Sequence, residues 1–146
     1  MSTLLVCVDF SNVTSALIEA AERQSRALGA DVVLLHVAPQ EPDFVGFEVG
    51  PEPVRHIVAQ RLREEHRQVQ QLADALRARG IEAQGLLVMG SVVDKTLEQA
   101  RRLHAEMILM GSHGHSAIYD LLVGSATESV LRHADRPVLV VPARGR

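Results

Sequence analysis

Five short apolar runs alternate along this chain with longer amphipathic stretches, and that alternation limits the folds open to it more than any other feature. The runs are residues 4–8, 32–38, 86–89, 107–110 and 138–141. They hold almost no polar residue, which is typical of strands buried on both faces of a sheet. The stretches between them place apolar residues at helical spacing. The sequence predicts helices over residues 14–28, 54–79, 91–104 and 125–133.

Helices between parallel strands imply right-handed crossover connections, so the pattern predicts an α/β fold. The expected fold is a single doubly wound, Rossmann-like domain over residues 1–146, with a five-stranded parallel sheet and helices on both faces. A chain of 146 residues buries enough surface to fold without a disulfide or a metal. Gly29 and Gly80 mark two helix ends, and Ser91 with Asp94 is expected to cap a helix start.

Sheets of this class bind ligands at the carboxyl ends of their strands, near the point where the strand order reverses. A ligand site is therefore expected in the loops that follow Asp9, Ala38, Met89 and Met110. The sequence predicts that functional residues lie in these loops.

The segment 39–53 differs in composition from the rest of the chain. It holds four prolines, four acidic residues and no basic residue, together with Phe44 and Phe47. A long loop of this kind after a strand is often a lid or an interface element. The other interpretation, a solvated connection with two rings packed on the domain, stays open.

The distribution of charge argues against two classes of partner. The net charge is −3 and the basic residues are spread along the chain, so we expect no nucleic acid and no anionic membrane as partner. No apolar run approaches the roughly 20 residues of a membrane span, and the N-terminus does not resemble a signal peptide. The single cysteine, Cys7, lies in the first apolar run and is expected to be a core residue. These features favour a cytoplasmic protein.

A constellation of glycines follows the fourth apolar run. Gly111 is followed by Gly114, and after nine more residues by Gly124 and Ser125. Glycine lets the backbone approach a phosphate closely, and a helix that starts at Ser125 would offer free N–H groups with a partial positive charge. The pattern therefore favours a phosphate-binding site. The alternative is a capping box from Ser125 to Glu128, with Gly124 as a turn residue.

These motifs resemble those of the universal stress proteins. The ATP-binding members of that family carry glycine, two residues, glycine, nine residues, glycine and then serine or threonine, and this chain matches at Gly111, Gly114, Gly124 and Ser125. The resemblance extends over the whole chain, through residues 5–11, 34–37, 110–114 and 136–141. It implies a fold like that of the adenine nucleotide alpha hydrolases and a stress-response module that binds ATP, ADP or AMP, with Mg²⁺ carried by the phosphates.

The resemblance also implies individual site residues. Asp9 would bond adenine or ribose, Val37 would hold adenine through its backbone, and Met110 would line the same slot. The glycine loop and the helix start would hold the ribose and phosphates, through Gly111, His113, Gly114, Gly124, Ser125, Ala126 and Thr127. In this family the fifth strand often packs across a homodimer axis, which implies an interface at Val138, Leu139, Val140 and Val141.

Two features depart from the family pattern. Cys7 stands where ATP-binding relatives often have proline, and segment 39–53 matches no family motif.

Two other polar residues have ordinary structural interpretations from the sequence. Asp9 is a candidate cap for the helix that follows it, with Ser11 nearby, and His36 is expected to be a hydrogen-bonded core residue.

The sequence shows no catalytic constellation. It has no Walker A motif and no nucleophile spaced with a base, and its one lysine, Lys95, lies in a predicted helix. His113 and His115 lack further ligands at metal-binding spacing. Phosphoryl transfer depends on positioned cations, so we expect ATP hydrolysis that is slow at best.

The sequence leaves some other classes of function open and disfavours others. A slow ATPase or nucleotidyl-transfer enzyme on the same fold stays open, as does an interaction module that no longer uses nucleotide. A phosphoacceptor receiver domain is disfavoured, since the third run ends at Met89 and Gly90 and no lysine follows Val141. A dinucleotide-binding fold is disfavoured because Gly-x-Gly-x-x-Gly is missing after the first run.

Overall fold

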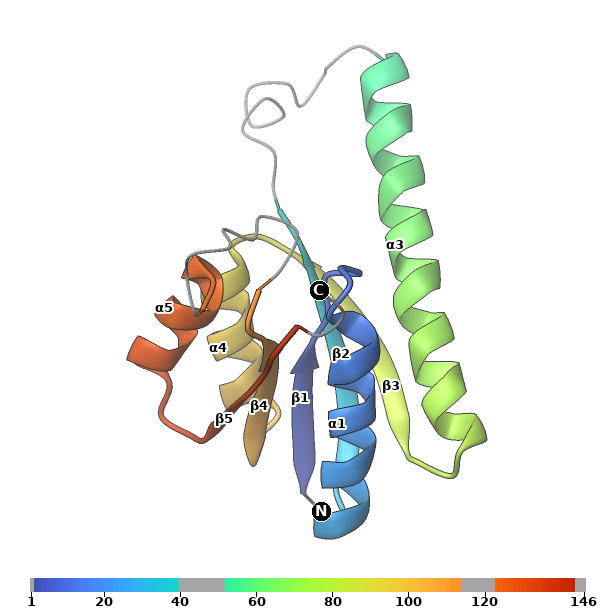
Figure 1. Cartoon of the computed structure of the whole chain (residues 1–146). Helices are drawn as coiled ribbons and strands as arrows, with labels where there is room; N and C mark the ends of the chain where they lie inside the picture. Colours follow the sequence, from blue (N-terminus) through green and yellow to red (C-terminus); the bar gives the residue numbers. More distant parts are fainter. Residues whose placement is uncertain (1, 40–51, 114–122, 144–146) are drawn as a thin grey trace.

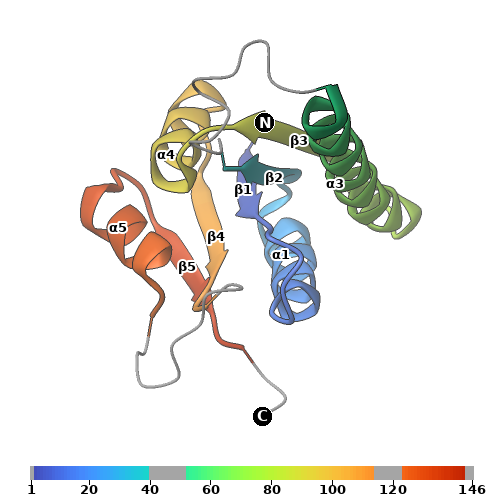
Figure 2. The same cartoon turned by 90° about the horizontal axis from the view of Figure 1, so that it is seen from above.

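A five-stranded parallel sheet forms the middle layer of the computed structural model, and helices lie against both of its faces (Figure 1, Figure 2). The structure describes residues 2–39, 52–113 and 123–143. The strands are β1 (Thr3–Cys7), β2 (Asp31–Ala38), β3 (Ala83–Met89), β4 (Met107–Gly111) and β5 (Val138–Val141). The helices are α1 (Thr14–Leu28), α3 (Glu52–Ala78), α4 (Val92–Arg102) and α5 (Ser125–His133). This architecture confirms the predicted doubly wound α/β fold.

The sheet is apolar because both of its faces are covered. Side chains alternate along each strand, so in β1 Leu4 and Val6 pack with α1 and α3, while Leu5 packs on the opposite face with α4 and α5. Figure 2 shows the same division, with α1 and α3 on one side of the sheet and α4 and α5 on the other. Strands buried in this way need apolar residues at every position, which explains the unbroken runs in the sequence.

The strand order β3-β2-β1-β4-β5 reverses direction between β1 and β4. Val6 of β1 pairs with Leu34 of β2 on one side and with Leu109 of β4 on the other. The helices that follow these two strands, α1 after β1 and α5 after β4, lie on opposite faces of the sheet, and this arrangement opens a crevice at the carboxyl ends of the two strands. The ligand site of this chain is therefore expected between β1 and β4.

Local signals set most helix boundaries. Gly29 adopts φ 64°, a left-handed conformation that ends α1 at the predicted residue. The hydroxyl of Ser91 accepts the N–H of Asp94 at 3.4 Å, which confirms the predicted cap of α4. The prediction that α4 reaches residue 104 was wrong, since the helix ends at Arg102 and His104 has φ 50°.

The strand β3 begins at Ala83, three residues before the predicted run of 86–89. The extra residues include the exposed Gln84 and the half-buried Gly85, which carry no apolar signal. They still pair with β2, because β3 is an edge strand whose outer face need not be apolar. A Cβ on Gly85 would lie 3.0 Å from the carbonyl oxygen of Val69, so glycine lets α3 pack closely on this strand.

The helix α3 is longer than the sheet that it covers. Its 27 residues span about 40 Å, and Figure 1 shows its first half extending beyond the carboxyl ends of the strands. The residues that join the core come from its second half: Val69, Ala73 and Leu76. The first half of α3 therefore lies outside the core, and part of it borders the ligand crevice described below.

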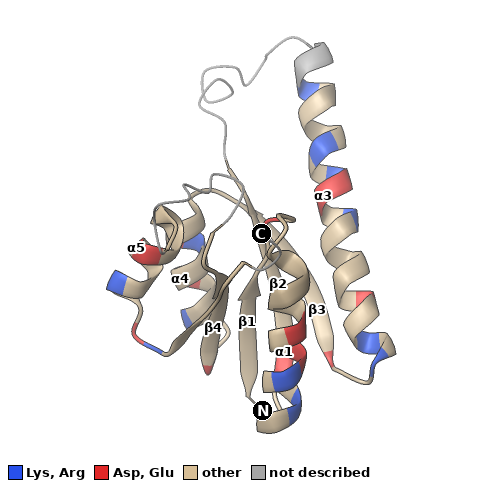
Figure 3. Ribbon diagram, viewed as in Figure 1, with Lys and Arg blue, Asp and Glu red and all other residues tan. Residues whose placement is uncertain are grey.

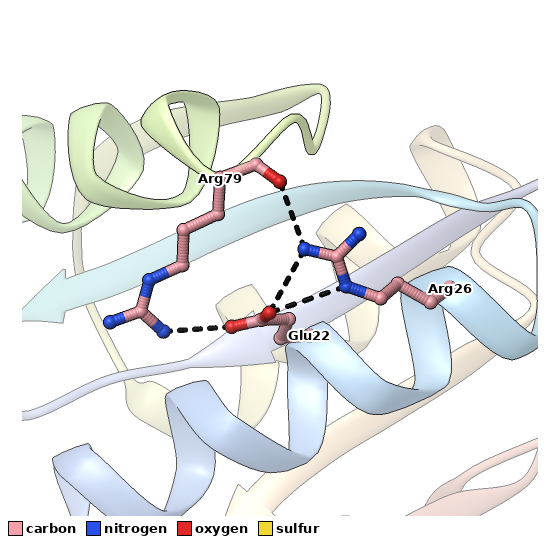
Figure 4. Close-up of polar contacts among 3 residues, drawn as sticks. All are labelled: Glu22, Arg26 and Arg79. Carbon is pink, nitrogen blue, oxygen red and sulfur yellow. Dashed lines mark hydrogen bonds and ion pairs between the residues drawn. The ribbon is translucent and has the colours of Figure 1, made fainter.

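At the opposite end of the sheet, a polar cluster joins α1 to the end of α3 (Figure 4). Glu22 accepts hydrogen bonds from Arg79 at 2.7 Å and from Arg26 at 3.0 Å, and Arg26 also donates to the carbonyl of Arg79. The hydrogen bonds from Arg79 and then Arg26 lower the pKa of the Glu22 carboxyl. The cluster ties the two helices together far from the crevice.

Acidic and basic residues are interspersed along α3 and α1, as Figure 3 shows. Among the described residues, no helix combines the length and the apolar character that a membrane span requires.

Candidate functional site

A cavity of about 700 Å³ lies at the carboxyl ends of β1, β2 and β4. The start of α5 closes one side of it, and residues of α3 and α4 line two others. Its position is the crevice at which the strand order reverses, where doubly wound sheets bind ligands. Its volume lies within the range of small-molecule sites, which is roughly 300–1,000 Å³.

The predicted nucleotide residues converge on this cavity. Those within the described part of the chain all line it: Asp9, Val37, Met110, Gly111, His113, Gly124, Ser125, Ala126 and Thr127. Gly114 lies outside the described residues. The structure thus brings together side chains from β1, β2, β4 and α5 that are up to 118 positions apart between Asp9 and Thr127.

The start of α5 directs backbone donors at the cavity. Gly124 is the residue before the helix, with extended backbone angles of φ −66° and ψ 160°, and its carbonyl accepts the N–H of Glu128 at 2.9 Å. The N–H groups of Ser125, Ala126 and Thr127 therefore have no carbonyl partner within the helix. Together with the positive end of the helix dipole, they form the kind of site that binds a phosphate.

The capping box predicted as an alternative is wrong. Ser125 is the first residue inside the helix, and the cap position belongs to Gly124, which has no side chain. Glu128 does not reach back to the cap but pairs with Arg132 at 2.8 Å. The glycine leaves the cavity side of the helix start free of a side-chain cap.

Thr127 has a structural bond in addition to its place in the cavity wall. Its hydroxyl donates to the carbonyl oxygen of Gly111 at 2.8 Å, and the residue is 5% exposed. The N–H of Gly124 donates to the carbonyl of Ser112 at 2.6 Å. These two bonds hold the start of α5 against the end of β4.

The two motif glycines that the structure describes differ in surroundings. A Cβ on Gly111 would lie 2.6 Å from Cγ1 of Val13, the residue before α1, which is 2% exposed. A Cβ on Gly124 would make only ordinary contacts, with the Ser112 carbonyl oxygen at 3.4 Å and with Cα of His113 at 3.8 Å. Gly111 is thus required for packing between β4 and α1, whereas space beside Gly124 is left for a ligand.

Asp9 shapes the turn between β1 and α1. Its Oδ1 accepts the N–H of Ser11 at 3.0 Å, as in an Asx turn. It does not cap the helix, because α1 starts at Thr14 and Val13 holds the cap position. The next residue, Phe10, has φ 62°, which for a bulky side chain costs about 1–3 kcal/mol and indicates a turn held by its surroundings.

His36 of β2 lies directly under that turn and is 6% exposed. Its Nδ1 is 2.9 Å from the carbonyl oxygen of Val8, and its Nε2 is 2.5 Å from Oε2 of Glu65 on α3. The ring of Phe10 lies against it, with 4.5 Å between ring centroids. The prediction of a hydrogen-bonded core histidine is confirmed.

Several cavity residues were missed by the sequence interpretation. They include Phe10, His36, Arg61, Glu65, Gln68, Val92 and Thr96. The signal for those on α3 was present, because positions 61 and 65 continue the spacing of the buried residues Val69 and Ala73 toward the helix start. When two charged residues continue the buried face of a helix, they either form an ion pair with residues beneath the helix or line a ligand site.

Cys7 borders the cavity on the side of α4. Its sulfur lies 3.6 Å from the hydroxyl of Thr96. Burial raises the pKa of the thiol to about 11, although the hydrogen bond with Thr96 acts in the opposite direction. At neutral pH this wall of the cavity is therefore uncharged.

Among the side chains that the structure describes, no group of three His, Cys, Asp or Glu residues is placed to hold a metal ion.

The fold and cavity define a class: a doubly wound α/β protein with a ligand site at the switch point between β1 and β4. The family model described as the universal stress protein family matches residues 1–142. This chain belongs to the universal stress protein family.

Individual relatives support the same assignment. A universal stress protein of Thermus aquaticus is 29% identical over 140 residues, which cover 95% of this chain and 97% of the relative. The solved structure of protein MJ0577 of Methanocaldococcus jannaschii superposes with a TM-score of 0.83 at 25% identity, over 99% of this chain and 98% of that one. A universal stress protein of Archaeoglobus fulgidus, solved in complex with dAMP, shares the fold with a TM-score of 0.69 at 19% identity, over 97% of this chain and 98% of that one.

Proposed function

We propose that this chain is an ATP-binding regulatory module of the stress response that acts without fast chemistry on the nucleotide. The observation that carries the proposal is the convergence of β1, β2, β4 and the start of α5 on one cavity. The family of this chain and the dAMP complex of a structural relative support an adenine nucleotide as the ligand.

The base would occupy the α4 side of the cavity. Leu35 and Val37 of β2 and Met110 of β4 present apolar side chains there, and the neutral Cys7 lies beside them. A slot with these walls suits a flat, weakly polar ring. The carboxylate of Asp9, which lines the same cavity, would accept a ribose or base hydrogen bond.

The phosphates would lie at the start of α5. The N–H groups of Ser125, Ala126 and Thr127 supply donors, and Ser125 adds an exposed hydroxyl. A Mg²⁺ ion would arrive on the phosphates, because such ions need only one or two protein ligands. His113 borders this region and would contact the ribose or phosphate.

Chemistry on the bound nucleotide is expected to be slow. The only lysine of the chain, Lys95, pairs with Glu98 at 3.0 Å on α4 and is not among the residues that line the cavity. Phosphoryl transfer draws its rate from cations placed on the transferred group, whereas backbone donors bind phosphate without that charge. Incubation with Mg²⁺ and ATP tests this, and several turnovers per second would instead indicate an ATPase.

The partner for the outer edge of the sheet is proposed to be a second copy of this chain. The strand β5 ends the strand order, and Val138, Leu139 and Val140 are only half-buried. An apolar edge strand is a liability for a monomer, and pairing of two such edges covers both. Sedimentation velocity at physiological ionic strength is expected to show a dimer.

The test of the nucleotide site is the pair Gly124→Ala and Gly124→Val. A methyl group on Gly124 makes only ordinary contacts with Ser112 and His113, and we expect the two further methyl groups of valine to enter the region proposed for the phosphates. We expect calorimetric ATP affinity to fall by more than about tenfold for valine and by less for alanine. Both variants should keep the wild-type circular dichroism and melt within a few degrees of wild type. Normal ATP binding by Gly124→Val would reject this placement of the phosphates and favour an interaction module that no longer uses nucleotide.

A further inference from the structure

One chain of contacts connects α3 to the turn that carries Asp9. It runs from Glu65 on α3 to Nε2 of His36 at 2.5 Å, and from Nδ1 of His36 to the carbonyl of Val8 at 2.9 Å. The ring of Phe10 covers the imidazole with 4.5 Å between centroids. Val8 and Phe10 are the two neighbours of Asp9, so His36 contacts the backbone on one side of it and the side chain on the other.

The α3 end of this connection is held from a second direction. Nε of Arg61 lies 3.4 Å from Oε1 of Glu65, one helical turn earlier on the same face of α3. Oε2 of the same carboxylate contacts His36. Arg61 and Glu65 both line the cavity, so this part of α3 faces the site instead of the core.

The contacts around His36 fix its hydrogen bonding strictly. A backbone carbonyl accepts and cannot donate, so Nδ1 must carry a proton to bond Val8. Nε2 then bonds Glu65 only if one more proton is present on either the ring or the carboxyl group. The pair therefore shares one short hydrogen bond between side chains that are 7% and 18% exposed, and such a bond holds its two elements at a fixed distance.

The backbone of the turn shows that it needs such support. Phe10 has φ 62°, a conformation that bulky side chains rarely adopt unless neighbouring groups hold them there. The imidazole of His36 and the bond to Val8 are contacts that can supply this constraint.

We propose that Glu65 and His36 are positioning residues, which set the geometry of the turn at residues 8–10 from helix α3 and thereby set the affinity of the cavity for nucleotide. The part about affinity rests on the proposed function. Glu65 and His36 act through the placement of Asp9 and need no contact with the ligand. The position of α3 along the sheet is thus coupled to the strength of nucleotide binding.

The test compares three variants of the full chain. Glu65→Leu removes the acceptor and the charge. Glu65→Gln keeps a link, because an amide N–H can donate to a neutral Nε2 while Nδ1 still donates to Val8. Glu64→Leu is the matched control, since Glu64 is the neighbouring residue and pairs with Arg67 on the exposed face of α3.

Two measurements are made on each variant: the calorimetric Kd for ATP, and the backbone amide signals of Asp9 and Phe10 in the ¹H–¹⁵N spectrum of the free protein. We expect Glu65→Leu to raise the Kd by about tenfold, Glu65→Gln to stay within about threefold of wild type, and Glu64→Leu to leave it unchanged. The amides of Asp9 and Phe10 should shift strongly in Glu65→Leu and not in Glu64→Leu.

A purely structural role would lower the melting temperature of Glu65→Leu while the folded protein kept its Kd and the two amide positions, and that result overturns the proposal. Shifted amides with an unchanged Kd also overturn it. If wild-type protein binds no ATP, the proposed function fails on its own, and the amide signals alone then decide whether α3 positions the turn.

Discussion

Replacement of Gly111 by alanine is predicted to destabilise the fold, although alanine is the smallest possible side chain. The new Cβ would lie 2.6 Å from Cγ1 and 3.1 Å from Cγ2 of Val13. Valine is branched at Cβ and cannot rotate its methyl groups away cheaply, and Val13 is 2% exposed. Relief therefore requires the backbone of β4 or the start of α1 to move.

The magnitude follows from the cost of overpacking. Extra methyl groups in a well-packed core cost about 1–3 kcal/mol, and the loss of glycine freedom in the unfolded chain offsets about 0.4–1 kcal/mol of this. We expect a net loss of about 1–2 kcal/mol in the free energy of unfolding, or a melting temperature lower by roughly 3–8 °C for a domain of this size. Thermal and urea unfolding measure both quantities.

Two controls isolate the contact with Val13. Gly124→Ala adds the same methyl group to the neighbouring motif glycine, where only an ordinary 3.4 Å contact arises, and should unfold close to wild type. Val13→Ala combined with Gly111→Ala should lose less stability than the sum of the single changes, since the smaller residue removes the clash. Wild-type stability of Gly111→Ala would refute the packing role of this glycine.

Two further predictions concern charge. Burial raises the pKa of the Cys7 thiol to about 11, so the folded state holds the thiol proton more tightly than the unfolded chain does. The free energy of unfolding should therefore fall by on the order of 2 kcal/mol as pH rises from 9 to 11. Denaturant titrations of Cys7→Ala should not show this fall. The lowered pKa of Glu22 has the opposite sense. Its contribution is fully present above pH 4.5 and is lost progressively as pH falls through the lowered pKa of the folded state, so Glu22→Gln should melt further below wild type at pH 7 than at pH 3. An equal difference at both pH values would contradict the ion-pair explanation.

The fold was predictable because periodicity and capping agree along most of the chain. The bounds of α1, α5 and β5 follow the predicted ranges residue for residue, with Gly29 and Pro137 as local stop signals. The first part of β3 was not predictable from apolarity, since Gln84 and Gly85 lie on an edge strand that is stabilised by pairing with β2. Tertiary pairing decided that boundary, as it often does at sheet edges.

The site was predictable only where its residues form a local motif. The spacing of Gly111, Gly124 and Ser125 located the end of β4 and the start of α5 from the sequence. The α3 wall was only ambiguously marked. Arg61 and Glu65 continue the inward stripe of the helix, but they are also four residues apart and have the pattern of an ordinary surface ion pair. Their role depends on where α3 passes the end of the sheet, which is a property of the whole fold. The same holds for the clash that a side chain at Gly111 would make with Val13, which arises only in the folded structure.

The most direct test of the account is thermal unfolding of ligand-free protein with ATP, AMP or GTP, each with Mg²⁺. A ligand at about 100 times its Kd adds roughly 2.7 kcal/mol to the folded state, which raises the melting temperature by roughly 5–10 °C for a chain of this length. The account predicts a rise of that size with ATP, a smaller rise with AMP, which lacks the outer phosphates, and little change with GTP. No rise with any of the three nucleotides would contradict it.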